Sequence, residues 1–170
     1  MTETTRTGPP IAVRPAIHDD LLGLQAVAER TWRATYAGQL PEADIEAFLA
    51  AHYAPERLAQ RLGPGLFVAT RDAAVIGYAQ AGLNGEGHAE LFAIYVLPEM
   101  QGFGAGSQLW RRALARAHEL GQRDMLVWVL ATNAVARRFY ERQSARVVGE
   151  RAFSVGGGSV IEVGYRAALA

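Results

Sequence analysis

A glycine-rich segment near the middle of the chain, residues 97–107, constrains the fold more than any other stretch. It reads LPEMQGFGAGS, follows an apolar run and precedes an amphipathic run with helical spacing. This order predicts a strand, a tight turn and the N-terminus of a helix. Its three glycines leave backbone N–H groups uncovered by side chains, and the helix adds unpaired N–H groups and the positive end of its dipole. We therefore predict a phosphate-binding turn.

Two common kinds of phosphate loop do not fit this segment. A Rossmann turn has the order G-x-G-x-x-G directly after a strand, whereas here the order is G-x-G-x-G and four residues separate Val96 from Gln101. A Walker loop needs a lysine, and all 17 basic residues of this chain are arginines. Dinucleotide binding and nucleoside triphosphate hydrolysis are therefore not expected.

Composition narrows the class of protein and of partner. With 170 residues, half of them apolar, we expect a single domain at residues 11–170 after a polar, disordered tail at residues 1–10. The 17 basic residues balance 17 acidic ones without a long run of one sign, so neither nucleic acid nor an anionic membrane is an expected partner. No apolar run approaches the roughly 20 residues of a membrane span, and the tail lacks the apolar core of a signal peptide. We expect a cytoplasmic protein with a small-molecule partner.

The chain has no cysteine, which excludes disulfides, thiolate metal sites and a cysteinyl covalent intermediate. Its four histidines form no H-x-x-x-H pair, so no metal site is expected. Chemistry must therefore depend on oxygen, nitrogen or backbone groups.

The apolar spacing changes along the chain. A short strand at residues 11–15 precedes helical spacing at 18–35, 41–51 and 55–63, with proline in the first turn of the last two. The period then becomes two, which predicts an antiparallel meander of strands at 66–71, 75–83 and 89–96. A helix at 104–120, a strand at 125–130, a helix at 132–143 and two strands within 145–166 complete an α/β (α+β) chain.

This order of elements resembles the GNAT superfamily of acyl-CoA-dependent N-acetyltransferases. The family's Q/R-x-x-G-x-G/A pattern matches residues 101–106, and its fourth strand matches residues 94–98 before them. The resemblance implies a central mixed, mostly antiparallel sheet of about seven strands flanked by helices, and a loop that wraps the pyrophosphate of acetyl-CoA. The cosubstrate-binding residues that it implies here are Ile94, Tyr95, Val96, Gln101, Gly102, Phe103, Gly104, Ala105, Gly106 and Ser107.

A second motif, N-x-x-A-x-x-F-Y at residues 133–140, looks like the family's helix after the fifth strand. Its two ends are seven positions apart, close to two helical turns, so both side chains lie on one face. By resemblance, Asn133 and Ala136 bind the pantetheine arm and Tyr140 protonates the leaving thiolate. The alternative for Tyr140 is a core aromatic that packs the helix on the sheet, the role that we assign to Phe139.

Attack on a thioester needs a neutral amine, so a base is required. Glu90, at the start of the strand that leads into the loop, resembles the family's usual base; a solvated strand end is its alternative, and His88 is another candidate base. The resemblance also implies splayed fourth and fifth strands, with a backbone N–H near Tyr95 or Val96 that polarises the thioester carbonyl.

The first half of the chain sets the choice of acceptor in this superfamily, and residues 31–49 resemble bacterial small-amine and polyamine acetyltransferases. Trp32 and Tyr36 lie one helical turn apart and are candidate walls of an amine site, with core packing as the alternative. Acidic residues near a cationic acceptor would come from Glu42, Asp44 and Glu46. We expect acetyl transfer to a small primary amine, such as a polyamine or an amino-acid derivative.

Two other functions remain open: a protein or peptide N-acetyltransferase, and a non-catalytic module that binds coenzyme A. The family pattern also allows a homodimer through the terminal strands. One departure from it follows the second motif, where Ser144 and Ala145 replace the usual Gly-Phe. Serine there must adopt a left-handed helix end at a modest energetic cost.

Overall fold

The computed structural model describes residues 10–169, so residues 1–9 of the predicted tail lie outside the described residues. Its strands form one seven-stranded sheet in the order β1-β2-β3-β4-β5-β7-β6. Strands β4 and β5 are parallel, and the other neighbouring strands are antiparallel. The predicted mixed, mostly antiparallel sheet flanked by helices is confirmed.

The first part of the chain is mostly helical. Its elements are β1 (Ala12–Pro15), the 3₁₀ helix η1 (His18–Asp20), α1 (Leu21–Tyr36), α2 (Glu42–Tyr53) and α3 (Pro55–Ala59). Apolar residues recur every three or four positions of α1, and that face is buried. Helix α3 ends at Ala59 rather than at the predicted residue 63, because the chain tightens into i→i+3 hydrogen bonds ahead of Gly63 and Pro64.

The predicted meander consists of β2 (Leu66–Arg71), β3 (Ala74–Leu83) and β4 (Ala89–Val96). Asp72 and Ala73 form the first turn with φ angles of 50° and 63°, as a tight hairpin requires. In the β3–β4 pair, Gln80 is opposite Ala93 and Ala81 is opposite Leu91, so Phe92 is the extra residue of a β-bulge. The bulge shifts the register of side chains between the two halves of β4.

The second half continues with the 3₁₀ helix η2 (Pro98–Met100), α4 (Ala105–Glu119), β5 (Asp124–Leu130), α5 (Ala134–Arg142), β6 (Arg146–Val155) and β7 (Gly158–Ala168). Helices α4 and α5 pack on one face of the sheet, in a core that includes Trp110, Val127 and Tyr140. Helices α1, α2 and α3 pack on the other face, in a core that includes Leu24 and Leu49. Among the described residues, no helix is both long and apolar enough to cross a bilayer.

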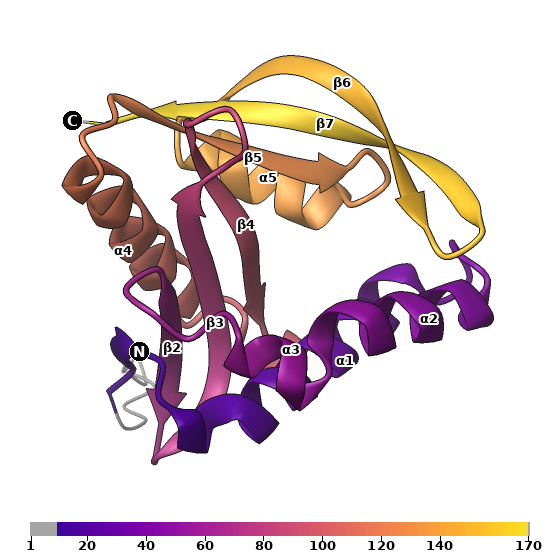
Figure 1. The fold of residues 1–170 in the computed structure, drawn as a ribbon, viewed down its shortest axis with the longest axis horizontal. Helices are drawn as coiled ribbons and strands as arrows, with labels where there is room; N and C mark the ends of the chain where they lie inside the picture. Colours follow the sequence, from indigo (N-terminus) through magenta and orange to yellow (C-terminus); the bar gives the residue numbers. More distant parts are fainter. Residues whose placement is uncertain (1–9, 170) are drawn as a thin grey trace, which may run out of the picture.

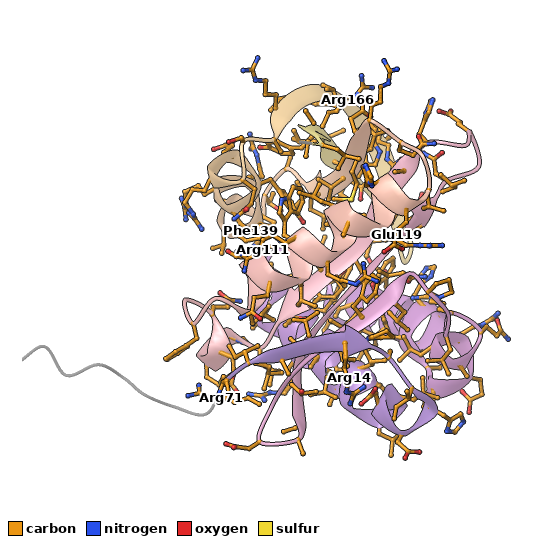
Figure 2. All side chains as sticks on the ribbon, turned by 90° about the vertical axis from the view of Figure 1, so that its left-hand side faces the viewer. Arg14, Arg71, Arg111, Glu119, Phe139 and Arg166 are labelled. Atoms are coloured by element: carbon orange, nitrogen blue, oxygen red, sulfur yellow. The ribbon has the colours of Figure 1, made fainter. Side chains whose placement is uncertain are left out.

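The figures show how the layers are arranged. In Figure 1, α4 lies on the opposite side of β2 and β3 from α1 and α2. Figure 2 turns the molecule so that α4 faces the viewer, with Arg14 of β1 near one end of the sheet and Arg166 of β7 near the other. One face of the sheet is therefore covered by α4 and α5, and the other by α1, α2 and α3.

Strands β4 and β5 pair over a short length. Their register joins Glu90 to Leu126 and Leu91 to Val127, and no further pair follows within the described chain. Beyond Leu91 the two strands diverge, so the β5-facing edge of β4 from the bulge to Val96 is not paired with β5. Polar backbone groups are thus left in the middle of a sheet.

The β6–β7 hairpin extends past the end of β5 and approaches α2 (Figure 1). At its tip the Gly157 N–H donates to Asp44 Oδ1 over 3.0 Å. A Cβ atom at Gly156 would lie 2.4 Å from the same oxygen, so only glycine allows this approach. The Phe153 ring also meets Phe48 of α2 edge-on, with centroids 6.0 Å apart. The first and last parts of the chain are therefore joined.

Helix α5 ends as the sequence predicts. Ser144 follows it with φ of 63°, in the left-handed region that usually takes glycine.

Candidate functional site

The glycine segment forms a loop that leads into α4. Gly102 and Gly104 have φ angles of 82° and 92°, and Gly104 is the N-cap residue of the helix. The Gln101 side chain closes the loop, because its Nε2 donates to the Val96 carbonyl over 3.2 Å. Within the described chain, several backbone N–H groups around the start of α4 have no hydrogen-bond partner: those of Gly102, Gly104, Ala105, Gly106 and Ser107. Together with the helix dipole they can hold an anion such as a pyrophosphate.

Contacts on both sides hold this loop in place. The Arg71 guanidinium lies 5.4 Å from the centroid of the Phe103 ring, which brings a cation of β2 beside the loop. A Cβ atom at Gly106 would lie 3.4 Å from Phe139 Cε2, so α4 and α5 approach closely at this glycine. Gln143 Nε2 donates to Ser107 Oγ over 3.4 Å. Arg71 could not be predicted as a neighbour of the loop, since its position depends on how β2 pairs in the sheet.

The unpaired edge of β4 presents its own backbone groups. Leu97 N–H donates to Ile76 of β3 over 2.9 Å. Because successive residues of a strand alternate in direction, the N–H groups of Ile94 and Val96 are directed toward β5. An extended amide chain can pair with this edge, and either N–H can donate to a carbonyl oxygen placed there. Of the two positions that the resemblance implied, Val96 has the suitable direction and Tyr95 does not.

Asn133 is the N-cap residue of α5. Its Oδ1 accepts the Ala136 N–H over 3.1 Å, and its Nδ2 donates to the Tyr36 hydroxyl over 3.2 Å. Burial raises the pKa of Tyr36 to about 12, so it remains a phenol at any physiological pH. One amide side chain therefore joins the end of α1 to the start of α5.

Tyr140 lies in the core between α4 and the sheet. It is only 4% exposed, and its ring is 5.6 Å from that of Trp110 and 5.7 Å from that of Tyr165. Its hydroxyl makes no hydrogen bond with any described residue. Burial raises the pKa of Tyr140, so the phenol is protonated at neutral pH. Phe139, assigned to the core, is partly buried and packs edge-on against Trp110.

Glu90 is held at the closed end of the β4–β5 divergence. Its Oε2 accepts a hydrogen bond of 3.0 Å from Asn84 Nδ2, and Asn84 Oδ1 accepts the N–H groups of Glu86 and His88. The turn therefore positions the carboxylate, which is half-buried. The His88 side chain is 58% exposed beside Glu86, as expected of a surface turn residue.

The aromatic residues of α1 are more deeply buried than an open amine site requires. Trp32 is 4% exposed, stacks on Phe48 at 4.2 Å, and donates from Nε1 to the Tyr95 hydroxyl over 3.0 Å. This burial favours the alternative of core packing for Trp32, and its role as a wall of an amine site stays a prediction. Tyr36 is also buried, and it meets the site through the hydroxyl that Asn133 contacts.

The acidic residues of α2 have other partners or positions. Asp44 binds the hairpin tip, Glu46 forms an ion pair with Arg33, and Glu42 begins the helix at the surface. Glu162 of β7 is a buried carboxylate on the sheet face that α1 and α2 cover; it is 7% exposed and lies opposite Leu130. Burial raises its pKa, although the ion pair with Arg151 opposes that shift.

Sequence reasoning missed Glu162 and its neighbours Arg151 and Trp128. A signal was present: Glu162 stands in the apolar alternation VIEVGY, where a charged residue needs a partner. The face to which it points depends on strand register, which the sequence did not define.

Comparisons with known proteins agree with this geometry. A model of the acetyltransferase (GNAT) family matches residues 24–144. The chain is similar to the uncharacterized N-acetyltransferase YuaI of Bacillus subtilis, at 32% identity over 91% of each chain. It is also similar to the spermidine N(1)-acetyltransferase of Thermoplasma acidophilum, at 28% identity over 81% of this chain and 89% of that one. The crystal structure of the PaiA N-acetyltransferase from the same organism, in complex with coenzyme A, superposes with a TM-score of 0.74 at 25% identity, covering 91% of this chain and 98% of that one.

Proposed function

Because this chain belongs to the acetyltransferase (GNAT) family and is an N-acetyltransferase that uses acetyl-CoA, we propose that it transfers the acetyl group directly to a small primary amine. The observation that carries the proposal is the junction of two features, both seen within the described range: N–H groups without a hydrogen-bond partner at the start of α4, and the β4 edge beside them that is not paired with β5. Together they suit the pyrophosphate and the amide-containing arm of one extended ligand.

The fit to acetyl-CoA can be assigned residue by residue. The loop from Gln101 to Ser107 holds the pyrophosphate, and the β4 edge from Ile94 to Val96 pairs with the pantetheine amides. Asn133 and Ala136, at the start of α5, line the arm on its other side. These assignments follow from backbone groups that have no partner in the described chain and from the Asn133 amide beside them.

Three groups have the chemistry that transfer needs, since acetyl-CoA supplies an activated thioester. Glu90 accepts the proton of the acceptor ammonium, directly or through water, and the neutral amine then attacks the carbonyl carbon. The Val96 N–H donates to the carbonyl oxygen as negative charge develops on it. Tyr140, whose hydroxyl has no hydrogen-bond partner among the described residues, donates its proton to the thiolate as the C–S bond breaks, and the extra proton on the new amide nitrogen then passes to the phenolate.

A small acceptor suits the closed side of the site. The hairpin tip is bound to α2 through Asp44 and Gly157, and Phe153 packs against Phe48 behind that contact. These contacts obstruct a polypeptide that would lie along the sheet past α2. The spermidine N(1)-acetyltransferase of Thermoplasma acidophilum, a relative named for a small-amine acceptor, is consistent with this.

The proposal is tested by following the free thiol of coenzyme A while acetyl-CoA is mixed with polyamines, amino acids, aminoglycosides or short peptides. Turnover with one class of small amine supports it. Turnover with peptides alone would refute the small-molecule acceptor. Tight acetyl-CoA binding without turnover would favour the non-catalytic module.

Tyr140→Phe tests whether the phenol takes part. We expect kcat to fall by about 10²- to 10⁴-fold, the usual contribution of general acid catalysis, with acetyl-CoA affinity unchanged in calorimetry. Tyr78→Phe is a matched control, because Tyr78 is also a buried tyrosine whose hydroxyl lacks a partner among the described residues. If both variants keep the wild-type kcat, Tyr140 is a packing residue.

A further inference from the structure

Arg151 of β6 is fixed by contacts on two sides. Its Nε donates to Glu162 Oε2 over 2.7 Å across the hairpin, and its guanidinium carbon lies 4.2 Å from the centroid of the Trp128 ring. Trp128 is itself placed by Gly164, where a Cβ atom would lie 2.7 Å from Trp128 Cζ3. Glycine therefore lets the indole lie against β7, and the indole supports the guanidinium.

The other end of this guanidinium has no partner among the described residues. Arginine carries five N–H donors, and the hydrogen bond to Glu162 uses the one on Nε. Neither terminal nitrogen bonds to any residue in the described range, and the side chain is 42% exposed. A planar fork held in one orientation is suited to bidentate binding of a carboxylate, and little side-chain entropy remains to be lost.

Strand pairing puts this fork on the acceptor side of the sheet. Arg151 is opposite Glu162, and Glu162 is opposite Leu130, so all three side chains share a face. Leu130 belongs to the core that α1 and α2 cover, and Phe153, the next residue on this face of β6, contacts Phe48. Trp128 and Glu90 lie on the same face. Every second residue of β5 points to one side of the sheet, so Leu126 and Trp128 share the face of Leu130, and Glu90 is opposite Leu126.

We propose that Arg151 binds the carboxylate of the acceptor, and that the acceptor is therefore an amino acid or another aminocarboxylate rather than a polyamine. This rests on the proposed function, because it concerns the acceptor of the same reaction. The amine of such an acceptor is directed toward Glu90 and the diverging strands, while its carboxylate is held at the fork. A polyamine would instead bring additional positive charge beside a guanidinium that its contacts with Glu162 and Trp128 hold in place.

The test compares each of the twenty amino acids with the amine that it would become on decarboxylation, for example L-leucine with 3-methylbutylamine. Spermidine serves as the purely cationic acceptor. We expect at least one amino acid to exceed its matched amine in kcat/KM by about 10- to 100-fold, as for the loss of a bidentate charged contact. If spermidine or the decarboxylated amines are acetylated as well as or better than every amino acid, the inference is wrong.

Variants then connect this preference to Arg151. Arg151→Met keeps an apolar stem over Trp128 and removes the fork, and should abolish the preference for the amino acid over its matched amine. Arg151→Lys, which keeps the charge as a point donor, should give an intermediate preference. Arg142→Met removes one exposed charge of α5 and should leave kcat/KM for the amino acid and for its matched amine unchanged. An equal loss for both members of a pair would show that Arg151 only supports Trp128 and Glu162.

Calorimetry separates failure of this inference from failure of the proposed function. Turnover confined to peptides would overturn the function itself. If no acceptor is turned over, the amino acids are titrated into the wild-type protein and Arg151→Met, each saturated with coenzyme A. Binding to the wild type that the variant loses supports the carboxylate site, whereas no binding, or equal binding to both, overturns it.

Discussion

Replacing Ser144 with glycine should stabilise the protein, because the serine occupies a backbone position suited to glycine. Helix α5 ends with a pair of hydrogen bonds, from Ser144 N–H to the Glu141 carbonyl and from Ala145 N–H to the Tyr140 carbonyl, both 3.0 Å long. This is the Schellman arrangement, in which the residue after the C-cap adopts a left-handed conformation. Ser144 does so with φ of 63°.

The magnitude follows from two opposing contributions. A side chain in the left-handed region costs about 1–2 kcal/mol. Glycine in return loses about 0.5–1 kcal/mol more entropy on folding. The Ser144 hydroxyl forms no hydrogen bond with the described residues, so its removal costs nothing further. We expect Ser144→Gly to raise the free energy of unfolding by about 0.5–1 kcal/mol, or Tm by about 1–4 °C for a chain of this size.

The assay is urea unfolding at neutral pH, with thermal unfolding as a second measurement. Ser154→Gly is the matched control: the same substitution, at an exposed position of β6 with extended backbone opposite Ser159, should destabilise by about 0.5–1 kcal/mol. If Ser144→Gly is neutral or destabilising while the control behaves as expected, the left-handed conformation carries no strain and the reasoning fails.

Two further predictions concern the loop and the first turn of the chain. Gly104→Ala puts a side chain at φ of 92° and should weaken acetyl-CoA binding at least tenfold in calorimetry. At Gly106 a Cβ atom would make ordinary contact with Phe139, so Gly106→Ala should bind acetyl-CoA within threefold of the wild type. Equal affinities of the two variants would contradict this. The pKa of Asp20 is lowered chiefly by hydrogen bonds of 2.7 and 2.9 Å from Arg14. Asp20→Asn should therefore lower the free energy of unfolding at pH 7 by about 1–3 kcal/mol. The difference in stability between the wild type and Asp20→Asn should be full at pH values above the ordinary carboxyl pKa of about 4. It should vanish as the pH falls through the lowered pKa of Asp20 in the folded protein. A Tm difference that is constant from about pH 7 to about pH 2 would rule out the ion pair as its source.

The parts of the site that sequence could predict are continuous in the chain. The loop at residues 101–107 and the helix start at Asn133 each depend on a few consecutive residues, so glycine positions and a cap signal were sufficient to locate them. The order of strands followed from period and turn residues in the same way. Helix ends were less certain, as the early end of α3 at Ala59 illustrates, because local packing decides the final turn.

The acceptor side could not be predicted, because it is assembled from strands far apart in sequence. A shift of one residue in the β6–β7 register would turn Arg151 and Glu162 to the opposite face. Trp32 was a candidate wall of the site because its helical spacing fitted both an exposed ring and a buried one. In the structure the ring is buried, stacked on Phe48 and hydrogen-bonded to the Tyr95 hydroxyl.

The contact between the hairpin tip and α2 joins residues 113 positions apart, and this separation has a consequence for biosynthesis. The loop, the β4 edge and the start of α5 lie between residues 90 and 140, so the groups assigned to acetyl-CoA emerge from the ribosome together. The acceptor side also needs β6 and β7, which are made after these groups, to close against α2, which is made before them. Pairing over such distances is intrinsically slow, so we expect a nascent chain to form its cosubstrate loop before its acceptor side closes.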